Sequence, residues 1–148
     1  MTLYRLAQAL LEETFAVMRR CGEGRRECQV LWISPWSHPE VLTQVIHPRH
    51  HAMGDGFDLD HQWITELWKQ LALDNTGVRV QVHTHPRRAF HSPTDDAWPV
   101  IHVPGFLSAV IPDFALGPIG FDGAYLAEIG PDGRWHRARF SERIALVP

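Results

Sequence analysis

Two histidines and an aspartate in one short stretch have the residue types and spacing of a metal site. His83 and His85 are two residues apart, so on an extended chain both side chains point to the same face. Asp95 follows His85 by ten residues, far enough for a loop to return its carboxylate to the same ion. Two imidazoles and a carboxylate form a three-ligand zinc set with one tetrahedral position open, as hydrolytic zinc needs. The pattern therefore predicts a Zn²⁺ site at His83, His85 and Asp95.

The residues around this set predict a strand, a loop and a helix that position it. The valines of 78–82 have the opposite parity to the histidines and can face a core. Ser92 has the preferred type for a helix N-cap, Pro93 suits the first helical position, and Asp95 stands where a capping box has its acid. A simpler interpretation is a half-exposed histidine pair and an aspartate that serves only the helix. The combination within so short a stretch favours the metal site.

The pattern His83-x-His85-Pro86 followed by Ser92-x-x-Asp95 resembles the JAMM motif of the JAB/MPN metalloprotease family. That family includes deubiquitinases and small prokaryotic members. The resemblance implies that the two histidines and the aspartate bind Zn²⁺ and that Ser92 steadies the tetrahedral intermediate. It also implies an upstream glutamate as general base and the MPN/JAB architecture, which is cytidine-deaminase-like.

Glu27 is the residue that we expect to be this general base. It precedes the mostly apolar run 28–33, which suits a central strand, and a carboxylate there can be held rigidly beside a site on the neighbouring strand. The family order of helix, glutamate and strand fits Glu27 better than Glu23, which lies in a Gly-flanked turn. The alternative for Glu27 is a surface carboxylate next to Arg25 and Arg26.

Asp96 remains an alternative to Asp95 as the third ligand. Six residues separate His85 from Ser92, fewer than in the family pattern, so the loop between them is slightly tight. A one-residue shift at the helix start would present the second aspartate instead of the first. The sequence alone leaves this choice open.

The remaining histidines and cysteines do not predict a second site. His47, His50 and His51 lie close together, but no cysteine or carboxylate has a fixed ligand spacing to them, so an exposed loop is the favoured interpretation. Cys21 and Cys28 are too few for a disulfide framework, and their spacing matches no zinc ribbon. We interpret them as reduced thiols.

Composition and periodicity predict a single α/β domain over 1–148, with a mixed sheet flanked by helices. Hydrophobic content of 45% and charged content of 21% are typical of a globular protein, and the formal charge of −3 predicts no basic face for nucleic acid. No signal peptide or membrane span is expected, which favours a cytoplasmic protein. The 113–122 segment is Gly- and Pro-rich and is expected to be a mobile flap. The expected elements are a helix over 3–22, strands over 28–33 and 41–46, a loop over 47–56, a helix over 63–71 capped by Asp58 or Asp60, a strand over 106–111, a hairpin over 123–140 and an edge strand over 144–147.

The resemblance implies a zinc-dependent isopeptidase or peptidase that cleaves the amide bond after the C-terminus of a ubiquitin-like protein. That ubiquitin-like protein or its conjugate is then the expected partner. By analogy within the family, the reaction could belong to a bacterial antiphage conjugation pathway. Three alternatives remain: a JAB-type amidohydrolase of another substrate class, a non-catalytic MPN binding module, and a structural zinc protein. The binding module is less favoured because all the expected site residues are present. The structural zinc protein is less favoured because only three ligands are visible.

Overall fold

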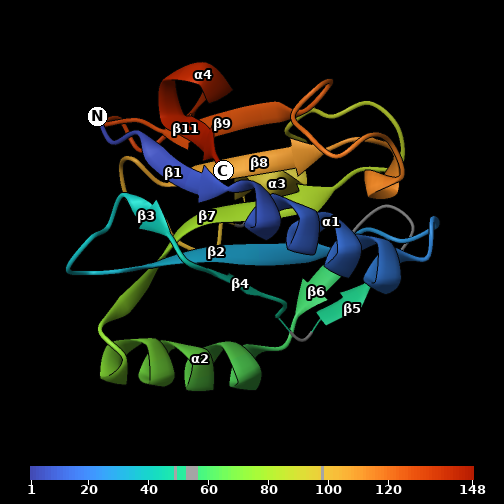
Figure 1. Cartoon of the computed structure of the whole chain (residues 1–148). Coiled ribbons are helices and arrows are strands. Elements are labelled where there is room, and N and C mark those ends of the chain that lie inside the picture. Colours follow the sequence, from blue (N-terminus) through green and yellow to red (C-terminus); the bar gives the residue numbers. More distant parts are fainter. Residues whose placement is uncertain (49, 53–56, 98) are drawn as a thin grey trace.

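The centre of the protein is a six-stranded mixed sheet, seen in a computed structural model that describes residues 1–48, 50–52, 57–97 and 99–148 (Figure 1). The strand order is β10-β9-β8-β7-β2-β4, with β7 and β8 parallel and the other neighbours antiparallel. Its strands are β2 (Gln29–Pro35), β4 (Gln44–Ile46), β7 (Thr76–Thr84), β8 (Leu107–Ile111), β9 (Tyr125–Ile129) and β10 (Trp135–Ala138). The two buried central strands, β7 and β2, are therefore neighbours.

Two smaller sheets accompany the large one. β1 (Tyr4–Ala7) lies between β11 (Ile144–Val147) and β3 (Val41–Leu42), and all three run parallel. β5 (His50–Ala52) and β6 (Phe57–Leu59) form an antiparallel pair. The parallel pairing brings the two ends of the chain together, with β11 at the edge as expected.

Helices cover both faces of the large sheet. α1 (Gln8–Gly22) lies in front of the sheet and α3 (Pro93–Ala97) behind it (Figure 1). α2 (His61–Leu73), capped by the Asp60 side chain, packs on the face opposite α1, and α4 (Phe140–Arg143) precedes β11. Alternation along β2 separates the two cores, since Val30 and Trp32 pack with α1 whereas Leu31 and Ile33 pack with α2. The expected mixed sheet flanked by helices is confirmed.

Three expected elements differ in the structure. The helix expected over 3–22 begins only at Gln8, because residues 4–7 alternate between buried and exposed and pair as β1. The strand expected over 41–46 is split between β3 and β4, which belong to different sheets. The loop expected over 47–56 contains β5, while 49 and 53–56 lie outside the described residues.

The start of the 113–122 segment, where a mobile flap was expected, is hydrogen-bonded to α1. Asp113, Phe114 and Ala115 all have positive φ, of 56°, 52° and 62°, a left-handed turn that costs energy for residues with a Cβ. Arg19 of α1 holds it by donating from Nε to the Ala115 carbonyl at 2.7 Å and from Nη2 to the Gly117 carbonyl at 2.8 Å. The expectation of a mobile flap is therefore wrong for the beginning of the 113–122 segment.

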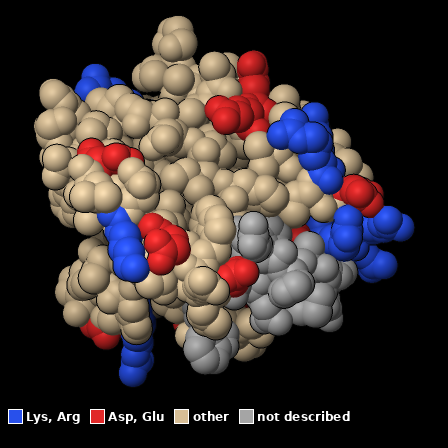
Figure 2. Space-filling view, turned by 90° about the horizontal axis from the view of Figure 1, so that it is seen from below, with Lys and Arg blue, Asp and Glu red and all other residues tan. Residues whose placement is uncertain are grey.

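Charged side chains of both signs are interspersed on the face seen from below (Figure 2). Over the described residues of that face, no continuous surface of one sign appears. None of the described helices is both long and apolar enough to cross a membrane.

Candidate metal centre and active site

His83 and His85 lie at the end of the central strand β7, on the face opposite α1. His83 is the cross-strand partner of Gln29, and Val82, with the opposite parity, packs into the α1-side core. The His85 N–H donates to the Ile111 carbonyl at 2.9 Å, so the chain beyond β7 stays tied to β8. Both imidazoles are nearly inaccessible, and their ring centroids are 5.2 Å apart. The strand thus presents two rigid imidazoles side by side.

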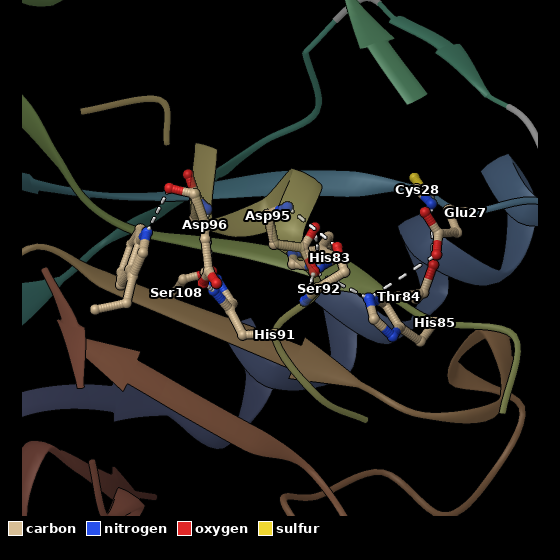
Figure 3. A network of polar contacts seen from close by, with 12 residues as sticks. Glu27, Cys28, His83, Thr84, His85, His91, Ser92, Asp95, Asp96 and Ser108 are labelled. Atoms are coloured by element: carbon tan, nitrogen blue, oxygen red, sulfur yellow. Dashed lines mark hydrogen bonds and ion pairs between the residues drawn. The ribbon is translucent and has the colours of Figure 1, made fainter. Parts of the chain in front are cut away.

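Asp95 reaches both histidines from the first turn of α3 (Figure 3). A reciprocal capping box sets its position: the Ser92 N–H donates to Asp95 Oδ2 at 2.9 Å, and the Asp95 N–H donates to Ser92 Oγ at 3.1 Å. Asp95 Oδ1 lies 3.2 Å from His83 Nε2, and Oδ2 lies 3.2 Å from His85 Nε2. The predicted helix start is confirmed, and it delivers the carboxylate to the histidine pair.

The electrostatics of this group keep its atoms in the protonation states that a metal requires. Burial lowers the pKa of His83, more strongly than the neighbouring Asp95 raises it, so the imidazole stays neutral. Burial works to raise the pKa of Asp95, but hydrogen bonds with His83 and His85 outweigh it and hold that pKa well below its usual value. A neutral imidazole and an ionised carboxylate are the ligand forms that bind Zn²⁺.

The separations within this group fit a tetrahedral ion. Two ligand atoms, each bonded to Zn²⁺ at the usual N or O distance, lie roughly 3.3 Å apart. Each Nε2 lies 3.2 Å from an Asp95 oxygen, and one donor atom from each of the three residues falls within 4.8 Å of the others. The three side chains, called the His–His–Asp cluster below, can therefore hold a metal ion.

Asp96, the alternative third ligand, contacts His91 instead of the histidine pair. Its Oδ1 lies 2.6 Å from His91 Nδ1, and His91 Nε2 lies 3.1 Å from the buried Ser108 Oγ on β8. Ser108 also accepts from Gln81 Nε2 at 3.0 Å. This chain of contacts ties the start of α3 to the sheet, and of the two aspartates the structure brings Asp95 to the histidines.

Glu27 lies at the edge of the His–His–Asp cluster, immediately before β2. Its Oε1 is 4.0 Å from His85 Nε2, and the residue is only 6% exposed. The alternative of a surface carboxylate beside the arginines is therefore excluded. Glu23 instead forms that surface group, with Oε2 at 2.8 Å from Arg25 and 3.2 Å from Arg26. Of these two glutamates, the structure places Glu27 beside the cluster.

Three neighbours of the cluster were not anticipated from the sequence. His91 and Ser108 anchor α3, and Gln29 lies across the ladder from His83 with its buried Nε2 lacking a hydrogen-bond partner among the described residues. Alternation gives Gln29 the same parity as Glu27, which was the available signal. For His91 and Ser108 no such signal exists, because their contact depends on how the loop folds over β8.

Comparisons with known proteins agree with this geometry. Over 128 residues the chain is 32% identical to the probable metalloprotease y4jG of Sinorhizobium fredii, covering 80% of this chain and 75% of the relative. A solution structure from Desulfitobacterium hafniense matches with a TM-score of 0.71 at 15% identity, over 98% of this chain and 93% of the other. A JAB1/MPN domain protein from Archaeoglobus fulgidus matches with a TM-score of 0.56 at 10% identity, over 97% and 98%. These two structures bear on the fold alone, and a comparison with models of protein families finds no match.

Proposed function

The chain belongs to the JAB/MPN metalloprotease family, and from this membership we propose that its site hydrolyses the amide bond after the C-terminus of a ubiquitin-like protein. A metallopeptidase of the JAMM type is the activity class of this family. The proposal adds the metal, the roles of the residues and the substrate. The observation that carries it is the gathering of a buried carboxylate, Glu27, beside two histidines and a capped aspartate on one face of the sheet.

Zn²⁺ is the proposed metal, held by His83, His85 and Asp95. When bound, it supplies a Lewis acid that polarises the scissile carbonyl and lowers the pKa of a water. The chain's own contribution begins with orientation, because the ladder fixes the imidazoles and the capping box fixes the carboxylate. Side chains held in this way would bind the ion in one fixed place.

Glu27 and Ser92 are the proposed catalytic residues. Glu27 takes a proton from the attacking water and passes it to the leaving amine, and its burial at 4.0 Å from His85 Nε2 holds it at the cluster. Ser92 Oγ accepts from the Asp95 N–H, and this bond leaves the hydroxyl proton available for the oxyanion of the tetrahedral intermediate. The same cap therefore orients a metal ligand and an oxyanion donor.

The rim of the site supports a peptide substrate. Phe90 is 43% exposed, and its ring meets His85 edge-on at a centroid distance of 4.6 Å. The Phe114 N–H donates to the His85 carbonyl at 2.9 Å, which brings the left-handed turn, followed by the exposed Leu116, to the same end of the sheet. An extended tail of a ubiquitin-like protein would find apolar contacts on these side chains. The context of a bacterial conjugation pathway, including antiphage defence, rests on analogy within the family.

The test uses zinc-loaded protein and a panel of probes: ubiquitin and bacterial ubiquitin-like proteins, each extended at the C-terminus by a short peptide, and unrelated acyl-amides of small size. Mass spectrometry reads the cleavage point. Cleavage directly after the ubiquitin-like C-terminus, lost in Glu27→Gln and kept in Glu23→Gln, is the expected result. Cleavage of the small amides alone would mean an amidohydrolase of another class. No turnover on any probe, with the protein folded and zinc-loaded, would favour a binding module.

A further inference from the structure

A second group of metal-ligand side chains lies on the opposite face of the sheet. Cys21, Cys28 and His47 each offer one donor atom, and the three atoms lie within 4.8 Å of one another. Cys28 Sγ is 3.3 Å from His47 Nε2. The Cys28 and Cys21 side chains are also hydrogen-bond partners, so the two sulfurs are in contact. These three residues are called the cysteine cluster below.

Three separate elements build the cysteine cluster. Cys21 comes from the last turn of α1, Cys28 immediately precedes β2, and His47 immediately follows β4. Cys28 is fully buried in the α1-side core, Cys21 is half-buried, and His47 is exposed. The cluster therefore extends from the core to the surface, and an ion can enter from the His47 side.

The chemistry of the donors selects the ion. Two thiols and an imidazole suit a borderline-soft cation, and Cys₂His is a known ligand set for Zn²⁺. A sulfur and a nitrogen bonded to one tetrahedral zinc ion lie roughly 3.5 Å apart, close to the Cys28–His47 separation. We propose that Cys21, Cys28 and His47 form a second zinc site, distinct from the His–His–Asp cluster, with solvent in the fourth position.

The second site includes the residue that follows the proposed base in the chain. Glu27 and Cys28 are adjacent in the chain, but Glu27 reaches His85 whereas Cys28 packs against the α1-side core. The Cys28 backbone is already paired with Thr84, which donates its N–H to the Cys28 carbonyl at 3.0 Å and accepts the Cys28 N–H on its hydroxyl at 2.9 Å. An ion on Cys28 would add a third restraint at the residue next to the proposed base.

A disulfide between Cys21 and Cys28 is the competing interpretation. Neither cysteine is in a disulfide in the structure, and a disulfide would not account for the approach of His47 Nε2 to Cys28 Sγ at 3.3 Å. A metal site uses all three side chains, which is why the geometry favours it.

Cobalt substitution distinguishes the two sites, because sulfur-to-cobalt charge-transfer absorption in the near ultraviolet needs a thiolate ligand and the His–His–Asp cluster has none. Full-length protein, reduced and freed of metal, is titrated with Co²⁺ alone. We expect about two cobalt ions per chain and the charge-transfer band. Cys21→Ser and His47→Ala should each bind about one ion, Cys21→Ser without the band and His47→Ala with the band lost or strongly weakened. His83→Ala should also bind about one ion and keep the band intact.

His38→Ala, at another exposed histidine, is the matched control and should behave as wild type. Because Cys28 is fully buried, Cys28→Ser is informative only if circular dichroism shows it folded; Cys21→Ser and His47→Ala decide the question without it. Binding of one ion without the band by folded, reduced wild-type protein would overturn the proposal. So would a band that persists unchanged in both Cys21→Ser and His47→Ala. A disulfide pair would be shown by two results together: a mass lower by two hydrogens under non-reducing conditions, and no binding of a second ion after reduction.

Discussion

The His–His–Asp cluster and the cysteine cluster lie on opposite faces of one sheet and differ in how they are built. The first is drawn from residues 83–95, a single strand, loop and helix start, and its donors are nitrogen and oxygen. The second takes its three donors from the ends of three elements spread over 21–47, and two of them are sulfur. Both sets leave one tetrahedral position open, but the buried Glu27 carboxylate lies beside the first, whereas the second joins the ends of three elements.

The two residues just before β2 contribute to different clusters. Successive residues of an extended chain point to opposite faces, so Glu27 and Cys28 can each belong to a different cluster. The carboxylate that we propose as the base is then held by the packing of the neighbouring Cys28 as well as by its own burial. Four sets of variants test this difference between the two clusters.

The largest effect is expected from the imidazole ligands. His83→Ala and His85→Ala should each lose the ion of the His–His–Asp cluster and all measurable amide hydrolysis, since two ligands cannot hold the metal at the cluster. Elemental analysis and a cleavage assay on the same preparation measure both. His102→Ala, at an exposed histidine bonded to the Gly133 carbonyl, is the control. Full metal content in His85→Ala would remove that residue from the ligand set.

Glu27→Gln should separate the base from the ligands. The amide keeps the shape but cannot accept the proton of water, so kcat should fall by about 10²–10⁴, the usual contribution of a positioned general base. Metal content should stay at the wild-type level in both clusters. Glu23→Gln, which alters only the surface ion pairs with Arg25 and Arg26, should cleave normally. A dead Glu23→Gln beside an active Glu27→Gln would move the base into the turn after α1.

The two adjacent aspartates should differ in the size of their effects. Asp95→Asn removes a ligand, and its loss of metal should approach that of the histidine variants. Asp96→Asn weakens only the contact to His91 that ties down α3, and loss of such a supporting contact costs about 10–100-fold in metal affinity or activity. Competition with a zinc indicator measures both affinities. Equal losses in the two variants would mean that the helix start holds the cluster in another register.

The smallest effect is expected at the link between the two faces. Arg19 lies on α1 close to Cys21, and it holds the turn whose Phe114 N–H donates to the His85 carbonyl. Arg19→Ala should destabilise the protein by about 1–3 kcal/mol, the range for hydrogen bonds from a charged group, a loss that thermal unfolding can detect. Hydrogen exchange should rise in 113–117. Arg20→Ala, at the exposed neighbouring position, should change neither, and an equal rise there would assign the effect to α1 as a whole.

The His–His–Asp cluster was predictable because its signals are local. The His-x-His parity, the Ser92 cap and the position of Asp95 all follow from rules that act over a few residues, and the structure brings these side chains together as expected. The choice between Asp95 and Asp96 was not predictable. It depends on His91 reaching Ser108 on β8, a contact between segments whose relative placement no periodicity encodes.

The cysteine cluster was not predicted either, because it also depends on contacts between segments that are distant in the sequence. Cys21 and Cys28 match no zinc-ribbon spacing, and His47 meets them only because β4 pairs with β2 in antiparallel register. The wrong prediction of a helix at residues 4–7, which form β1, has a similar cause. Leu6 fits a helical stripe with Leu3 and Leu10 as well as it fits a strand, and the parallel pairing with β11 at the other end of the chain decides between them. Long-range pairing thus overrides the local pattern.

The most direct test of the metal centre is anomalous diffraction at the zinc absorption edge, on crystals of protein purified without chelators. We expect an anomalous peak bonded to His83 Nε2, His85 Nε2 and a carboxylate oxygen of Asp95, with Glu27 beside it but outside bonding distance. A fully occupied zinc peak coordinated by Asp96, or by Glu27 in place of Asp95, would contradict the assignment. So would zinc found at the cysteine cluster alone.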